Sequence, residues 1–145
     1  MKAFHFSLER VLEWRRTELS LEEAKLQKLN AQRLALDAAR AELVRRGLEA
    51  HRNVSSALSV RGQALAELEA YRRWAVREES ALAARTAELQ LAINRQSRAA
   101  VEADRKVRVV ERLRERRHRE WDALAQHELE EMAAEAALAR WRRDY

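Results

Sequence analysis

Hydrophobic residues recur at intervals of three and four positions along most of the chain. In its first part the repeat passes through Leu8, Leu12, Arg15, Leu19, Glu22, Leu26, Leu29, Arg33, Leu36, Arg40, Leu43, Gly47, Ala50, Val54 and Ala57. A sustained period close to 3.5 residues keeps these positions on one narrow seam of a helix, which is the pattern of a coiled coil. Charged residues occupy several seam positions, so we expect imperfect pairing rather than a tight zipper.

The repeat is interrupted between residues 53 and 62. Serines, an asparagine and a glycine in this stretch compete with helix formation, so it predicts a turn. Beyond it the repeat continues through Leu65, Leu68, Tyr71, Ala75, Leu82, Leu89, Ile93, Ala100, Ala103, Val107 and Val110, with Trp121, Leu124 and Leu138 further on. The pattern predicts a first helix over about residues 7–54, a turn over 55–62 and a second helix over 63–142.

A single turn in this region sets which residues of the two helices face each other. We expect Leu26 near Ala92 and Ile93, Leu43 near Ala75 and Val76, and Leu8 near Val110. The first helix is too short to cover the end of the second, so these apolar residues are expected to be uncovered: Trp121, Leu124, Leu129, Met132, Leu138 and Trp141. The prediction for residues 1–145 is a single all-α domain, a long antiparallel two-helix coiled-coil hairpin with a protruding C-terminal helix end. Such a protein functions by docking to a partner.

The composition agrees with this fold. Two glycines and no proline in 145 residues exclude folds with many turns, among them β-sandwiches, βαβ folds and glycine-rich phosphate loops. The chain has no cysteine, which excludes disulfides and thiolate metal sites. No apolar run approaches the length of a membrane span, and the first residues lack the apolar core of a signal peptide. We therefore expect a cytoplasmic protein.

The sequence predicts no catalytic, cofactor-binding or metal site. The four histidines form no pair at helical spacing, and a thin rod offers no enclosed pocket for catalysis. Asn53-Val-Ser55 matches a glycosylation sequon, which we read as chance in a cytoplasmic chain. The expectation is therefore a protein that is not an enzyme and that uses no cofactor.

Charge is distributed unevenly along the second helix. The stretch 105–119 holds eight arginines or lysines and two glutamates, whereas 120–139 holds six acidic residues and no lysine or arginine. Three readings of the basic stretch stay open: a solvated helical face, a docking face for an acidic protein surface, or a nucleic-acid-binding helix. No stacking platform or groove-reading motif accompanies it, so we do not expect nucleic acid as a partner. Trp14 lies off the seam and should be exposed, while Tyr71 and Trp74 lie beside the turn.

Three short motifs resemble a known family. The opening Phe4-His-Phe6-Ser-Leu8-Glu-Arg-Val-Leu12-Glu-Trp-Arg15 resembles the N-terminal signature of the flagellar export protein FliJ, in which two phenylalanines precede a Leu-x-x-Val-Leu-x-x-Arg helix start. The stretch Val110 to Arg117, followed by Glu120-Trp121, resembles the family's Leu-x-x-Leu-x-x-Arg-x-x-x-x-Trp/Tyr segment. Leu129-Glu-Glu-Met132-Ala resembles the family's closing Leu-Asp-Glu-Ile-Ala. The three motifs follow in order over nearly the whole chain.

The resemblance implies a coiled-coil stalk like the central γ subunit of rotary ATPases. Family members insert their paired termini into the hexameric export ATPase and contact the cytoplasmic domain of the export gate, and some also handle export chaperones. Carried over position by position, the ATPase-facing residues are Phe4, Leu8, Leu12, Arg15, Arg112, Arg116, Trp121, Glu131 and Met132. The gate-facing residues are Val44, Gly47, His51 and Trp74, although the family often has tyrosines where Gly47 and His51 stand.

The implied function is a component of flagellar type III protein export, located in the cytoplasm and peripherally at the cytoplasmic face of the inner membrane through the export apparatus. Two alternatives remain open at this point. One is the equivalent stalk of an injectisome. The other is a structural or chaperone-like coiled coil without an ATPase partner.

Overall fold

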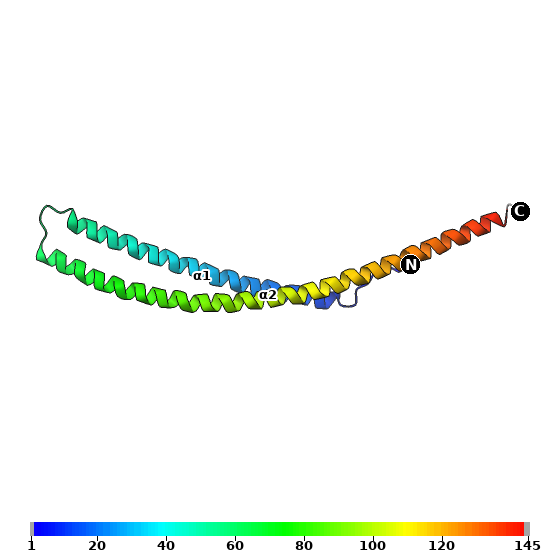
Figure 1. Ribbon diagram of the computed structural model, residues 1–145, viewed down its shortest axis with the longest axis horizontal. Coiled ribbons are helices and arrows are strands. Elements are labelled where there is room, and N and C mark those ends of the chain that lie inside the picture. The colour runs from blue at the N-terminus through cyan, green and yellow to red at the C-terminus, as the bar shows by residue number, and fades with distance from the viewer. Residues whose placement is uncertain (1, 144–145) are drawn as a thin grey trace. The chain divides into compact units, whose positions relative to one another are not determined.

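The computed structural model describes residues 2–143, which form two long helices joined by a short turn (Figure 1). Helix α1 spans Glu9–Ser55 and helix α2 spans Gly62–Trp141. The two helices pack against each other in opposite directions, and the described residues include no strand. The prediction of an all-α, two-helix hairpin is therefore confirmed.

The ends of the helices follow from the local sequence. At the start of α1, the Glu9 N–H donates to the Phe6 carbonyl at 3.2 Å, and residues 2–8 before it are not helical. At the end of α1, two groups of the serine-rich stretch donate to the same carbonyl. The Ser56 N–H and the Ser55 hydroxyl both donate to Arg52 O, at 2.9 and 3.3 Å. Side chains that bond their own backbone in this way compete with helix continuation.

The chain divides into two compact units, which we describe separately. In the unit Leu21–Ala100, the most buried side chains are Leu43, Leu82, Ile93 and Ala100, all on the predicted seam. The remaining predicted seam positions of α1 in this unit are half-buried, apart from the exposed Arg33. The seam was therefore predicted correctly for α1 here, whereas the predicted seam residue Leu65 of α2 is exposed.

Polar pairs lie between the apolar layers of this unit. Arg40 donates to the Glu79 carboxylate from Nη2 at 2.5 Å and from Nε at 3.0 Å. The Gln96 amide donates to both the backbone carbonyl and the carboxylate of Glu22, and the hydrogen bond from Gln96 is the main cause of a lowered Glu22 pKa. These groups connect α1 to α2 at defined positions, so they specify the register.

The other unit consists of residues Met1–Ser20 and Val101–Tyr145. Its buried side chains are Phe6, Leu12, Ala103, Val107 and Ala125. Leu12 is 0 % exposed and is the only large side chain among the described residues buried this completely. Small residues supply most of the α2 side of this packing, which lets the chain segments that cover α2 approach it closely.

The register in this unit differs from the prediction. Glu9 pairs with Arg114 at 3.0 Å, and Leu8 lines a groove with Leu113, about one helical turn beyond the predicted neighbour Val110. Leu8 precedes α1 and belongs to the non-helical residues 2–8, so the helical repeat that the prediction extended to this position does not determine its neighbour on α2.

Cover on α2 also extends further than predicted. The non-helical residues 2–8, which we call the N-terminal arm, lie along α2 and contact it as far as Trp121, and burial continues to Ala125. Trp121 is therefore half-buried rather than uncovered. From residue 126 to residue 143 every described side chain is exposed, which agrees with the predicted protruding helix end.

Candidate functional site

The N-terminal arm is held on α2 by an aromatic cluster, which consists of Phe4, His118 and Trp121. The Phe4 ring lies edge-on to the His118 ring with centroids 4.8 Å apart, and its centroid is 6.0 Å from that of Trp121. The indole N–H of Trp121 donates to the Lys2 carbonyl at 3.2 Å. His118 in turn contacts the Asp122 carboxylate through Nδ1 at 2.8 Å. The arm is thus fixed by one hydrogen bond and by ring packing.

A line of arginines follows the face of α2 opposite the covered seam. We call it the arginine stripe, and its members, spaced three or four residues apart and all exposed, are Arg105, Arg108, Arg112, Arg116 and Arg119. Arg105 and Arg108 are paired with the carboxylates of Glu102 and Asp104 on the same helix, at 2.7 and 2.8 Å. Within residues 2–143, Arg112 and Arg119 have no ion pair.

Carboxylates border the arginine stripe on α2. The hydrogen bond from Arg105 is the main cause of a lowered Glu102 pKa, and the Arg105 pKa is raised for the same reason. Glu120 lies close to both Arg116 and Arg117, at 4.0 and 3.2 Å. The arginine stripe is a single row of arginines with carboxylates on either side. Such a surface fits a narrow acidic surface of a protein better than the broad, uniformly negative surface of a nucleic-acid duplex.

The exposed end of α2 continues the covered seam. At intervals of three and four residues from Ala125, the helix carries the apolar stripe, consisting of Leu129, Met132, Ala136 and Ala139. Leu129 and Met132 are 62 % and 54 % exposed. The apolar stripe has the same spacing as the seam residues that are buried one turn earlier, but its own side chains are exposed. Exposed apolar residues in this arrangement are typical of a surface that a partner covers.

The structure distributes the predicted ATPase-facing residues among these features. Exposed positions on α2 are Arg112, Arg116, Glu131 and Met132, and Leu8 is exposed in the N-terminal arm, directly before α1. Phe4 and Trp121 pack on each other, and Arg15 is half-buried and paired with Glu18 at 2.9 Å. Leu12 is fully buried by its own chain, so in this conformation it supports the surface and does not form part of it.

The predicted gate-facing residues lie near the turn in the unit Leu21–Ala100. Val44 and His51 are exposed on α1, and the His51 ring Nδ1 lies 3.0 Å from the Arg72 guanidinium. Trp74 is exposed and its ring packs at 5.5 Å from the ring of Tyr71. Gly47 lies beside Tyr71 as well, so Gly47 and Trp74 both adjoin a tyrosine that the predicted set did not include.

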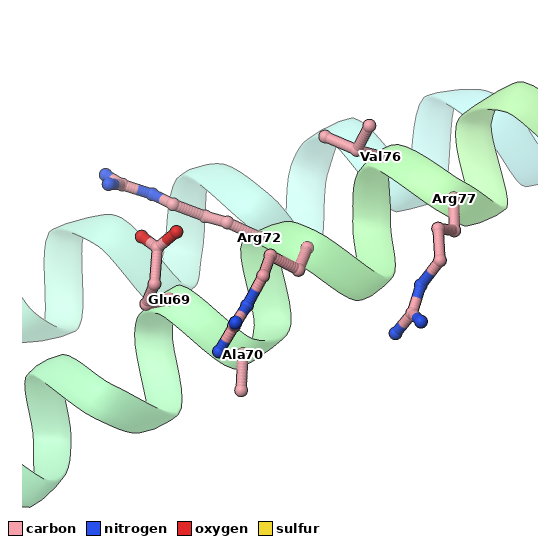
Figure 2. A pocket seen from close by; sticks show the side chains of 6 residues that line it. Glu69, Ala70, Arg72, Val76 and Arg77 are labelled. Carbon is pink, nitrogen blue, oxygen red and sulfur yellow. The ribbon is translucent and has the colours of Figure 1, made fainter.

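Shallow grooves lie along the helices. One of about 550 Å³ is lined by Glu69, Ala70, Arg72, Arg73, Val76 and Arg77. Figure 2 shows Glu69 and Val76 on one side of α2 and Arg77 on the other, so the polar groups do not converge. No group of acidic and histidine side chains within the described part of the chain is arranged to hold a metal ion. Neither helix, as far as it is described, contains an apolar segment that would cross a membrane.

The contacts of His118 and the burial of Ala125 were not predicted. Nothing in the sequence around His118 indicates that Phe4 is its neighbour. Ala125 was overlooked because a strict coiled-coil repeat places Leu124 on the seam, and Leu124 is in fact exposed. Comparison with known proteins adds no further guide, because no family model, curated protein or solved structure matches this chain.

Proposed function

We propose that this protein is a coiled-coil stalk of the flagellar type III export machine, which docks into the hexameric export ATPase and couples it to the cytoplasmic domain of the export gate. The observation that carries the proposal is the continuation of the covered seam of α2 into the exposed apolar stripe. A helix end of this kind requires a protein partner, and the family resemblance of the motifs supplies the candidate partner.

The mechanism that we propose is mechanical and electrostatic. The stalk occupies the ATPase ring, promotes hexamer formation and turnover, and presents the arginine stripe to acidic loops of the ring. Since Arg114 is engaged with Glu9 across the hairpin, the arginines available for this contact are Arg112, Arg116 and Arg119. The proposed location follows from the partners: the cytoplasm, peripherally at the inner membrane, with export chaperones as further partners.

The test is stimulation of the purified cognate ATPase by the full-length chain. Reversal of both Arg112 and Arg116 to glutamate should reduce stimulation at least about tenfold at low salt, because two attractions become repulsions. The matched control is Arg73→Glu with Arg77→Glu, an exposed pair on α2 with the same spacing and the same charge change. Absence of any stimulation by the wild-type chain would refute the proposed function, and equal loss in both double variants would remove the arginine stripe from the mechanism.

A further inference from the structure

The two edges of the apolar stripe differ in chemistry. On one side of the stripe lies the acidic edge, consisting of Glu128, Glu131 and Glu135, with the exposed Leu124 and Leu138 at its ends. The other side, which we call the neutral edge, is formed by Gln126, Glu130, Ala133, Ala137 and Arg140, so that its one glutamate is offset by one arginine. Spacings of one or two helical turns put each of these sets in a line parallel to the stripe. The surface is therefore apolar in the middle, negative along one edge and without net charge along the other.

The acidic edge has little intramolecular compensation. The Glu131 carboxylate contacts His127 Nδ1 at 3.4 Å, with both side chains about two-thirds exposed. Within residues 2–143, Glu128 and Glu135 have no ion pair. A partner that covers the apolar stripe also removes water from the neighbouring carboxylates, which is unfavourable for their charge. A partner with cationic side chains along that edge compensates this loss of hydration and therefore binds best.

A second copy of this chain is a poor occupant for the stripe. Two antiparallel copies of the segment would bring equivalent edges together, since a two-fold axis places the same surface on both sides. The acidic edges would then face each other, and like charges directly opposed are unfavourable. The charge pattern therefore argues against antiparallel self-association and favours a partner that brings cations to the acidic edge.

We infer that the exposed end of α2 docks with its apolar stripe in a protein groove whose rim is basic on the side of the acidic edge, and that Glu128, Glu131 and Glu135 determine the rotation of α2 in this groove. On the neutral edge, the short side chains of Ala133 and Ala137 allow the other wall of the groove to approach the helix closely. This inference rests on the proposed function, with the export ATPase as the protein that provides the groove.

The decisive experiment compares two neighbouring glutamates. Glu131 lies on the acidic edge, whereas Glu130 lies on the neutral edge in line with Gln126 and Ala133, and both are exposed. The dissociation constant of the full-length chain for the cognate hexameric ATPase should rise about fivefold or more for Glu131→Lys at low salt. Glu130→Lys, with the same charge change in the same turn, should alter it less than about twofold. The difference should shrink at high salt, because salt screens exposed charges.

The outcomes separate this inference from the proposed function. If the wild-type chain binds and Glu130→Lys and Glu131→Lys weaken binding equally, the inference about the acidic edge is wrong, while the proposed stalk function stands. No binding by the wild-type chain overturns both. Sedimentation equilibrium of the chain alone provides the second measurement: a monomer supports the inference, whereas a dimer that Met132→Glu abolishes identifies a second copy as the occupant and overturns it.

Discussion

Replacement of Gly47 by alanine should stabilise the protein. Gly47 lies in the interior of α1 and is half-buried against α2. Glycine in a helix interior costs about 0.8–1.0 kcal/mol relative to alanine, because its backbone loses more conformational freedom on folding. A Cβ built at this position would meet the Tyr71 ring at 4.0 Å, which is ordinary van der Waals contact, so no steric penalty offsets the gain.

The expected result is a gain of about 1 kcal/mol in the free energy of unfolding, which corresponds to a rise of about 2–4 °C in the melting temperature of a chain of this length. Urea and thermal unfolding followed by circular dichroism in the far ultraviolet would measure it. Gly62→Ala is the matched control, because Gly62 begins α2 with nothing within 4 Å of the built Cβ, where interior helix propensity does not apply in full. A destabilised Gly47→Ala variant would refute this reasoning. It would mean that the α1 backbone at Gly47 lies closer to the Tyr71 ring than the 4.0 Å contact of the built Cβ indicates.

Three further predictions concern stability. Leu12→Ala should cost about 2–4 kcal/mol in urea unfolding, since Leu12 is fully buried, whereas Leu34→Ala at an exposed site should change stability by less than about 0.5 kcal/mol. Tyr71→Phe should stabilise by about 1 kcal/mol, because the buried Tyr71 hydroxyl has no hydrogen-bond partner among residues 2–143. Hydrogen bonds from Arg45 and Arg46 lower the Glu42 pKa from its ordinary value of 4.5 to about 2, so the stability that this carboxylate contributes is complete above pH 4.5 and is lost as the pH falls toward 2.

Each of these predictions has an outcome that contradicts it. Equal losses for Leu12→Ala and Leu34→Ala would show that the seam of the terminal unit is not packed as described. A destabilised Tyr71→Phe variant would show that the hydroxyl has a partner. In acid titrations, Glu42→Gln should flatten the fall of the unfolding free energy between pH 4.5 and about 2, and an unchanged slope would show that the Arg45 and Arg46 contacts do not persist in solution.

The heptad repeat was enough to predict the helices, the turn and most seam positions, because apolar spacing determines which face of a helix is buried. It did not predict the polar seam residues of α2, such as Glu79 and Gln96, since a count of apolar positions cannot detect a carboxylate or amide that is satisfied by the facing helix. These residues are visible only once both helices are aligned.

The candidate surface was predictable in part. The exposed apolar residues at the end of α2 and the change from basic to acidic charge are plain in the sequence, and the protruding end agrees with both. The place where cover ends was not predictable, because it depends on a non-helical arm that contacts α2 through Phe4. Burial of Ala125 rather than Leu124 agrees with a helix period of about 3.6 residues, in place of the 3.5-residue period that the heptad count assumes.

The polar pairs of the unit Leu21–Ala100 also bear on how it responds to force. If α1 were pulled along α2, the Arg40 guanidinium would leave Glu79 and pass apolar positions before it met another carboxylate, and the Gln96 amide would lose both of its acceptors on Glu22. Small displacements of α1 along α2 are therefore opposed at two places, the Arg40–Glu79 pair and the Gln96–Glu22 pair. An equivalent packing of the two helices recurs only after a shift of a whole heptad, about 10 Å. Such a hairpin transmits a push or a twist along its axis without gradual slippage.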